Sequence, residues 1–278
     1  VEFADSYWRI IRVNGNGTIR MIYSGTANGG VSNSNKTGTT TQIGISTYNP
    51  TYNDNTYVGY MKSLNNSGNS TSYSGAHSNL YDSNAKATID TWYQNNIANK
   101  AEYSKHVDTN TGFCNDREIA VEHSNYTGGG YGTGKTIYKS GDRLFTANFY
   151  GFKIKQTPIF QCGNKERDLF TISTAGIGNK KLTYPVGMIT SDETIFAGGL
   201  GGTNNNTFYL YTNENYWTMS PSRYDNDKAL VFFINSSGIL AGSNDVSTII
   251  GFRPVINLRA DTKFTGNGSE ATPFEVAN

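Results

Sequence analysis

The first alternation of apolar and polar residues lies at the start of the chain and predicts a β-hairpin. Residues 8–13 read WRIIRV and residues 18–23 read TIRMIY. The sequence NGNG at residues 14–17 supplies turn residues between these two runs. We therefore expect a pair of antiparallel strands at the N-terminus.

A second periodicity, with the spacing of a helix, lies between residues 89 and 97. Its positions recur every three or four residues, as they do on one face of an α-helix. Ser83 or Asn84 can cap the N-terminus of this helix. The repeating positions are Ile89, Trp92, Tyr93, Asn96 and Ile97.

A shorter helix is predicted in the sequence TSDETIFAGG, residues 190–199. Ser191 is the expected N-cap. The carboxylates of Asp192 and Glu193 suit the positive N-terminal end of the helix, and this role explains the adjacent pair better than acid–base chemistry does. Gly198 and Gly199 are expected to end it.

The C-terminal third of the chain returns to strand patterns, and INSSGIL at residues 234–240 predicts a hairpin turn between two of them. With strands at both ends of the chain and only two helices between them, the expected fold class is α+β. No fixed-period repeat of a solenoid is present. The predicted strands are FYLYT (208–212), YWTMS (216–220), ALVFFIN (229–235), GILAGS (238–243) and GFRPVINLR (251–259).

Residues 26–78 differ from the rest because they are rich in Gly, Ser, Thr and Asn and poor in aliphatic residues. This composition is typical of a long loop region or a linker. Tyrosines recur within it, however, and large aromatic side chains favour packing against a core. The expectation is a loop-rich segment that packs on the rest of the domain through Tyr48, Tyr52, Tyr57 and Tyr60.

Charge argues against two classes of partner. The 278 residues include 23 Lys and Arg against 22 Asp and Glu, a net charge of +1. This balance gives no electrostatic reason to expect binding to nucleic acid or to an anionic membrane surface. No apolar run approaches the roughly 18 residues that a bilayer-spanning helix needs. We expect no membrane insertion of this segment.

The uncharged polar residues point to the cell exterior. The chain has 31 Gly and 19 Tyr, with abundant Asn, Ser and Thr, and only 16% of its residues are charged. Such residues form turns, β-rich surfaces and adaptable recognition surfaces. No signal peptide is visible, so Val1 is expected to be a processing point or a boundary within a longer chain.

One short motif suggests nucleotide binding but lacks the required context. Residues 128–136, GGGYGTGKT, satisfy the P-loop pattern at Gly129, Gly134, Lys135 and Thr136. A P-loop follows a buried apolar strand and opens a helix, whereas EHSNYT precedes this motif and Gly141 is expected to interrupt any helix a few residues after it. We interpret the motif as a Gly-rich surface loop.

The remaining motifs give no catalytic or metal site. None of His77, His106 and His123 belongs to a zinc-binding pattern, and no nucleophile-elbow motif occurs. RYDNDKA at residues 223–229 carries the oxygen ligands of a calcium loop but lacks the EF-hand spacing, so solvated turn residues are the simpler interpretation. We expect no enzyme activity, no metal and no cofactor.

The two cysteines, Cys114 and Cys162, form an even pair in a chain of extracellular composition. They are either disulfide-bonded or two buried thiols, and the Gly-rich segment between them favours the disulfide. Such a bond closes a loop of about 48 residues, worth roughly 4 kcal/mol in the chain-entropy model.

Several segments together carry a resemblance to a family. These segments, in order, are WRIIRVNGNGTIRMIY (8–23), GFCNDRE (112–118), LTYPVGMITSDETIFAGG (182–199), YWTMSPS (216–222), GFRPVINLRAD (251–261) and the tail GNGSEATPFEV. They resemble an uncharacterised family of bacterial surface and secreted domains with a C-type lectin-like fold, often attached to pilin-like N-termini. The resemblance covers about two thirds of the chain, and residues 26–78 do not align with it.

The resemblance implies one C-type lectin-like domain over residues 1–278. In that fold the N- and C-terminal strands pair, two helices flank them, and a long loop region forms the binding surface. The GFRPV segment also resembles formylglycine-generating enzymes and retroelement variable proteins, which share this scaffold. The lectin motifs E-P-N and Q-P-D are absent, and Cys114 and Cys162 do not match the cysteine pattern of those enzymes. Neither calcium-dependent sugar binding nor that enzyme chemistry is implied.

These observations predict a secreted or cell-surface bacterial module that binds a host or microbial protein or glycan. The alternative is a structural subunit of a pilus or filament that assembles with itself. Two residues of the C-terminal third have a second interpretation: Trp217 as a core residue, and Arg253 as a structural residue paired with a buried carboxylate. The predicted ligand-binding residues are Tyr216, Trp217, Arg223, Tyr224, Asp225, Asn226, Asp227, Asn235 and Asn244.

Overall fold

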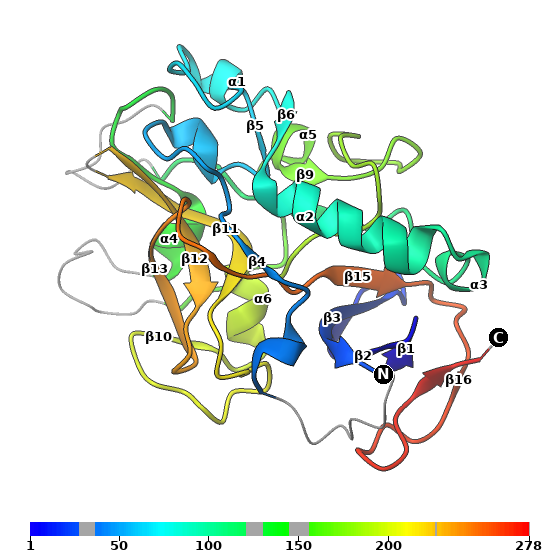
Figure 1. The fold of residues 1–278 in the computed structure, drawn as a ribbon. Helices are drawn as coiled ribbons and strands as arrows, with labels where there is room; N and C mark the ends of the chain where they lie inside the picture. Colours follow the sequence, from blue (N-terminus) through cyan, green and yellow to red (C-terminus); the bar gives the residue numbers. More distant parts are fainter. Residues whose placement is uncertain (28–36, 121–129, 145–155, 226, 278) are drawn as a thin grey trace.

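A computed structural model describes residues 1–27, 37–120, 130–144, 156–225 and 227–277. The fold is mixed α+β, as predicted, and is built on two sheets. Figure 1 shows the six-stranded sheet with both chain termini on one side of the molecule and the seven-stranded sheet on the other.

The six-stranded sheet contains the predicted N-terminal hairpin, β2 (Ser6–Val13) and β3 (Ile19–Thr26). Strand β15 (Val255–Leu258) pairs antiparallel with β3, so the C-terminal GFRPVINL segment lies beside the start of the chain. The remaining order is β2, β1 (Glu2–Phe3), β17 (Glu275–Val276) and β16 (Phe264–Thr265). The pairing of N- and C-terminal strands is confirmed.

The seven-stranded sheet is centred on β11 (Tyr216–Asp225) and β12 (Lys228–Ile234). The hairpin predicted at INSSGIL joins β12 to β13 (Ile239–Asp245). The sheet runs β10 (Leu200–Gly201), β13, β12, β11, β14 (Ile250–Gly251) and β4 (Ile45–Ser46), and β8 (Thr136–Ile137) also pairs with β11.

The strand predicted at residues 208–212 is wrong. Phe208 and Leu210 are buried, but the backbone turns at this point, with Phe208 N–H bonded to the Asn205 carbonyl and Tyr211 N–H bonded to the Phe208 carbonyl. Alternating burial of apolar side chains has the same pattern in a turning loop as in a strand, and the periodicity does not distinguish them.

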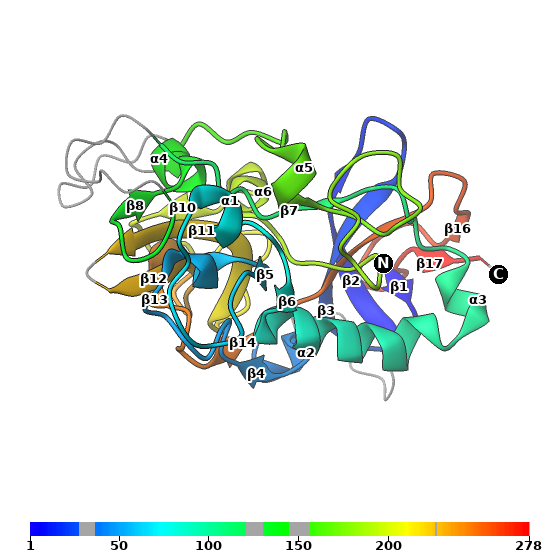
Figure 2. The same cartoon turned by 90° about the horizontal axis from the view of Figure 1, so that it is seen from above.

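The main helix, α2 (Asn84–Tyr93), continues as one π-helical turn, η3 (Gln94–Ala98). Ser83 is the N-cap, and its side chain accepts a hydrogen bond from Lys86 N–H at 3.0 Å. Figure 2 shows α2 running along the six-stranded sheet. Trp92 packs edge-on against Trp8 and Tyr23 there, which confirms the predicted apolar face.

The second predicted helix, α6 (Ser191–Phe196), begins one residue earlier than expected. Thr190, not Ser191, is the N-cap, and it forms a capping box with Glu193. Ser191 is instead buried, with its backbone N–H bonded to Ser220 on β11. Gly198 ends the helix region with a φ of +93°, a conformation that glycine adopts readily.

Short elements make up the rest of the described secondary structure. Two small sheets pair β5 (Met61–Lys62) with β6 (Tyr81–Asp82) and β7 (Phe113–Cys114) with β9 (Leu169–Phe170). The short helices are α1 (Tyr73–Ala76), α3 (Ala101–Ser104), α4 (Lys139–Leu144), α5 (Lys165–Asp168), η1 (Thr39–Thr41) and η2 (Asn55–Val58).

The described part of residues 26–78 is loop-rich but belongs to the core. Tyr48, Tyr57 and Tyr60 are fully buried, as their recurrence predicted, whereas Tyr52 is 40% exposed. Strand β4 from this segment joins the seven-stranded sheet. The segment therefore contributes both core side chains and a strand.

Candidate functional site

Three of the sequence-predicted ligand residues lie in the core. Tyr216, Trp217 and Tyr224 are fully buried, so they cannot contact a ligand at the surface. Trp217 packs edge-on against Tyr48 and Phe233, which confirms the alternative interpretation of this residue. The prediction took aromatic residues for surface anchors, but the segment YWTMSPSRYD forms a central strand that is covered on both faces.

The other predicted residues separate to opposite ends of the seven-stranded sheet. Arg223 and Asp225 end β11, and Asn244 lies opposite Val231 near them. Asn235 lies at the far hairpin, where its side chain accepts hydrogen bonds from the N–H groups of the turn. Asp227 is exposed, and Asn226 lies outside the described residues. These residues do not form one site.

Arg253 is a structural residue, as predicted, but its partners are different. Its guanidinium is buried, donates hydrogen bonds to the carbonyls of Tyr23 and Leu210, and lies over the Tyr216 ring. The expected carboxylate is replaced by carbonyl oxygens and an aromatic face.

The described part of the P-loop motif has the wrong context for a nucleotide site. Thr136 begins strand β8 rather than a helix, and its buried hydroxyl donates to the Gly134 carbonyl. The short helix α4 that follows includes Gly141, so the prediction that this glycine interrupts a helix is wrong. Lys135 lies 3.6 Å from the Asp225 carboxylate. Gly128 and Gly129 lie outside the described residues.

An open groove, the aromatic groove, lies where the N-terminal hairpin, the 206–211 turn and the 268–273 loop meet. Its volume is about 570 Å³. Tyr209 is 50% exposed, and the guanidinium of Arg9 lies over its ring at 5.4 Å. We define the groove by Tyr7, Arg9, Thr40, Asn206, Tyr209, Tyr211 and Glu270.

The aromatic groove offers apolar rings beside uncharged hydrogen-bonding groups and two charged side chains, Arg9 and Glu270. Partial burial raises the pKa of Tyr7 and of Tyr209, so both phenols remain neutral donors at physiological pH. The sequence analysis missed Tyr209 because it assigned FYLYT to a strand. The available signal was the polar stretch GGTNNNT before it, which is typical of a loop.

A second, smaller concavity of about 270 Å³ lies between the hairpin and α6. Charged side chains from distant parts of the chain meet in it. Arg12 Nη1 and Arg20 Nε lie 2.9 Å and 2.6 Å from Glu193 Oε1. We call it the charged pocket and define it by Arg12, Arg20, Asp116, Arg143, Phe160, Leu169, Asp192 and Glu193.

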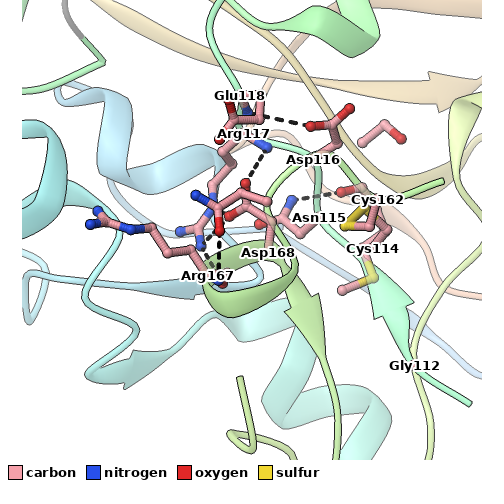
Figure 3. Close-up of a disulfide and its surroundings, with 12 residues drawn as sticks. Gly112, Cys114, Asn115, Asp116, Arg117, Glu118, Cys162, Arg167 and Asp168 are labelled. Atoms are coloured by element: carbon pink, nitrogen blue, oxygen red, sulfur yellow. Dashed lines mark hydrogen bonds and ion pairs between the residues drawn. A yellow bond between two sulfur atoms is a disulfide. The ribbon is translucent and has the colours of Figure 1, made fainter. Parts of the chain in front are cut away.

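The confirmed disulfide forms part of the wall of the charged pocket. Cys114 and Cys162 are bonded, with a Cα–Cα distance of 5.6 Å (Figure 3). Asp116 lies two residues after Cys114, and its carboxylate forms an ion pair with Arg143 Nη2 at 2.8 Å. The disulfide thus joins the segment that carries Asp116 to the segment that carries Phe160.

A buried polar network lies beside the disulfide in this wall (Figure 3). Asp168 accepts hydrogen bonds from the backbone N–H and from Nε of Arg117, at 3.0 Å and 2.9 Å. Asn115 donates to the Met219 carbonyl at 2.7 Å and so ties the segment to β11. Fully satisfied buried networks hold a segment in one conformation.

Within the described ranges, no group of three or more His, Cys, Asp and Glu side chains could hold a metal ion. The described helices include none that is both long and apolar enough to cross a bilayer.

Comparisons with protein families, curated proteins and solved structures gave no match to this chain.

Proposed function

We propose that this protein is a bacterial ligand-binding and adhesion module, secreted or displayed at the cell surface, without enzyme activity. The observation that carries the proposal is the aromatic groove. Exposed Tyr209 and the half-buried Tyr7 and Tyr211 lie beside Asn206 and threonine hydroxyls. Rigid aromatic side chains beside short polar groups are characteristic of surfaces that recognise proteins or glycans.

Two further features support this setting. The disulfide between Cys114 and Cys162 is compatible with an oxidising, extracellular environment. The pairing of β15 with β3, with α2 alongside them, supports a C-type lectin-like scaffold and hence the resemblance to bacterial surface domains. Fold alone does not assign function, so the groove remains the basis of the proposal.

Removal of the exposed Tyr209 ring is expected to weaken the binding of a ligand in the aromatic groove. A glycan array and a panel of host extracellular proteins would identify a ligand for the wild-type protein. Tyr209→Ala should then lower affinity about tenfold or more, because hot-spot energy is concentrated in a few aromatic anchors. Tyr52→Ala, which removes a 40% exposed tyrosine outside the groove, is the matched control and should bind normally.

Titration calorimetry of the three proteins measures this effect. Equal affinity of wild type and Tyr209→Ala would refute the groove as the binding site.

Light scattering and electron microscopy of the purified protein test the alternative function. A stable monomer agrees with the ligand-binding module, and regular polymers would instead favour a pilus or filament subunit.

A further inference from the structure

The charged pocket is separate from the aromatic groove and is lined by other residues. Arg12 and Arg20 come from the hairpin, Asp192 and Glu193 come from the first turn of α6, and Arg143 comes from α4. These charges come from three separate segments of the sequence, and the fold brings them around one concavity.

The described charged side chains that line this pocket are four cations, Arg12, Arg20, Arg143 and the exposed Lys165, and three carboxylates, Asp116, Asp192 and Glu193. The ion pairs among the other six are unequal on the two sides of the pocket. On the hairpin side, two guanidiniums, those of Arg12 and Arg20, share the single carboxylate of Glu193. On the α4 side, one guanidinium, that of Arg143, is shared by the carboxylates of Asp116 and Asp192 at 2.8 Å each. Counted over these ion pairs of the described residues, the hairpin side therefore carries an excess positive charge and the α4 side an excess negative charge.

Burial makes this imbalance energetically important. Asp116, Asp192, Glu193 and Arg20 are each less than 5% exposed. Burial raises the pKa of Asp116 despite the adjacent Arg143, and Asp192 contributes to the rise. Burial likewise lowers the pKa of Arg20 despite Glu193. Each side would gain from an additional group of opposite charge, because an incompletely compensated buried charge is costly.

One of the two hairpin guanidiniums, that of Arg12, lies at the mouth of the pocket. The side chain of Arg12 is 21% exposed and lies over the Phe160 ring at 4.4 Å. Its hydrogen bond and ion pair within the described residues use Nε, which contacts Asn14, and Nη1, which contacts Glu193. Nη2 is oriented by these two contacts and can donate to a carboxylate.

Apolar surface completes the pocket. Phe160 is 54% exposed and stacks on Phe196 at 3.9 Å, and Ile159 and Leu169 also line the pocket. The volume of about 270 Å³ is smaller than the roughly 300–1,000 Å³ of sites for drug-sized ligands. A ligand of this site must be small, partly apolar and charged at two ends.

We propose that the charged pocket binds a free α-amino acid with an apolar side chain. Its carboxylate contacts Arg12, its ammonium group contacts Asp116 and Asp192, and its side chain packs on Phe160 and Leu169. This arrangement satisfies both excess charges with one zwitterion. A simple anion would satisfy only the hairpin side, and a simple amine only the α4 side.

Three ligands of matched shape test the charge requirement on the wild-type protein. L-Leucine carries both groups, 3-methylbutylamine lacks the carboxylate, and 4-methylpentanoate lacks the ammonium group. Calorimetry should show L-leucine binding at least about tenfold more tightly than either analogue, since each charge-assisted hydrogen bond contributes about one order of magnitude. L-Methionine and L-phenylalanine extend the test to other apolar side chains.

Two variants test which residue contacts the ammonium group of the ligand and which contacts its carboxylate. Asp116→Asn removes a negative charge, so it should weaken L-leucine binding about tenfold and leave 4-methylpentanoate binding unchanged or stronger. Arg12→Gln should weaken both of these ligands and leave 3-methylbutylamine unaffected. Arg259→Gln, which removes an exposed guanidinium outside both the charged pocket and the aromatic groove, is the control and should bind L-leucine normally.

Several results would overturn the proposal. One is the absence of binding of all three amino acids to the wild-type protein. Another is tighter binding of 4-methylpentanoate than of L-leucine, which would make the pocket an anion site. Because these measurements use the unmodified protein, they hold even if Asp116→Asn fails to fold. Loss of L-leucine binding in Tyr209→Ala would also overturn the proposal, because L-leucine would then bind in the aromatic groove and not in the charged pocket.

Discussion

At the scale of single residues, His77 shows how burial controls charge. It is 4% exposed, its ring contacts Tyr73 at 4.2 Å, and its Nδ1 lies 2.7 Å from the Tyr73 carbonyl. Burial, together with the positive charges of Arg117 and Arg167, lowers the pKa of His77 to about 3. The folded protein therefore holds this imidazole neutral across the physiological range.

This neutral imidazole predicts a specific dependence of stability on pH. An unfolded His has a pKa near 6.5, so between about pH 6.5 and 3 the unfolded state binds a proton that the folded state does not. The stability that depends on neutral His77 is present above pH 6.5 and is lost as the pH falls. The slope from this one group approaches about 1.4 kcal/mol per pH unit at most.

His77→Gln tests this slope, because glutamine hydrogen-bonds but does not titrate. Urea denaturation from pH 7 to pH 4 should show a shallower loss of stability in the variant than in the wild type, whatever the difference at pH 7. Parallel curves for the two proteins would show that His77 is not the group responsible. His106→Gln, at a histidine that lies outside this contact, provides the comparison.

At the scale of elements, the capping box of α6 links local structure to the charged pocket. Thr190 Oγ1 accepts from Glu193 N–H, and Glu193 Oε2 accepts from Thr190 N–H, both at 3.0 Å. The same Glu193 carboxylate pairs with Arg12 and Arg20. Glu193 therefore both caps the start of α6 and holds the guanidiniums of Arg12 and Arg20 in the charged pocket.

Thr190→Ala should destabilise the protein by about 1 kcal/mol, because Glu193 N–H loses its side-chain acceptor. Thr190→Ser retains the hydroxyl and should stay close to the wild type. Thermal or urea denaturation measures both variants. If the serine variant were as unstable as the alanine variant, the methyl group rather than the cap would be the important feature.

The elements were more predictable from sequence than the sites. The hairpins, α2 and α6 follow from short-range periodicity and turn residues, and only the cap of α6 was shifted by one position. Burial was less predictable: Tyr224, in the polar sequence SRYDND, is fully buried, whereas Tyr209, in the more apolar sequence FYLYT, is half exposed. The charged pocket could not be predicted, because Arg12, Asp116 and Asp192 meet only through tertiary packing.

At the scale of the whole molecule, an ion pair links the six-stranded sheet to the seven-stranded sheet through α6. Arg20 on the six-stranded sheet pairs with Glu193 on α6, which packs on β11 of the seven-stranded sheet. The Cys114–Cys162 bond joins the neighbouring segments, so the charged pocket lies at the junction between the sheets.

Reduction of the disulfide should lower the free energy of unfolding by about 4 kcal/mol, the entropy of a closed loop of 48 residues. Urea denaturation with and without reductant measures this difference. Reduction should also weaken L-leucine binding more than binding in the aromatic groove, because only the charged pocket has the disulfide in its wall. An unchanged midpoint in the fully reduced protein, checked by thiol alkylation, would contradict the expectation.

The same disulfide has a consequence for resistance to proteases. Residues 115–161 lie inside the covalent loop, so a single cut of the backbone there yields two pieces that stay joined through the sulfur atoms. The pairing of β8 with β11 holds part of that loop in place as well. A nicked molecule therefore migrates as one species on a non-reducing gel and as two on a reducing gel. In an environment rich in secreted proteases, a cut in this region leaves the molecule in one piece.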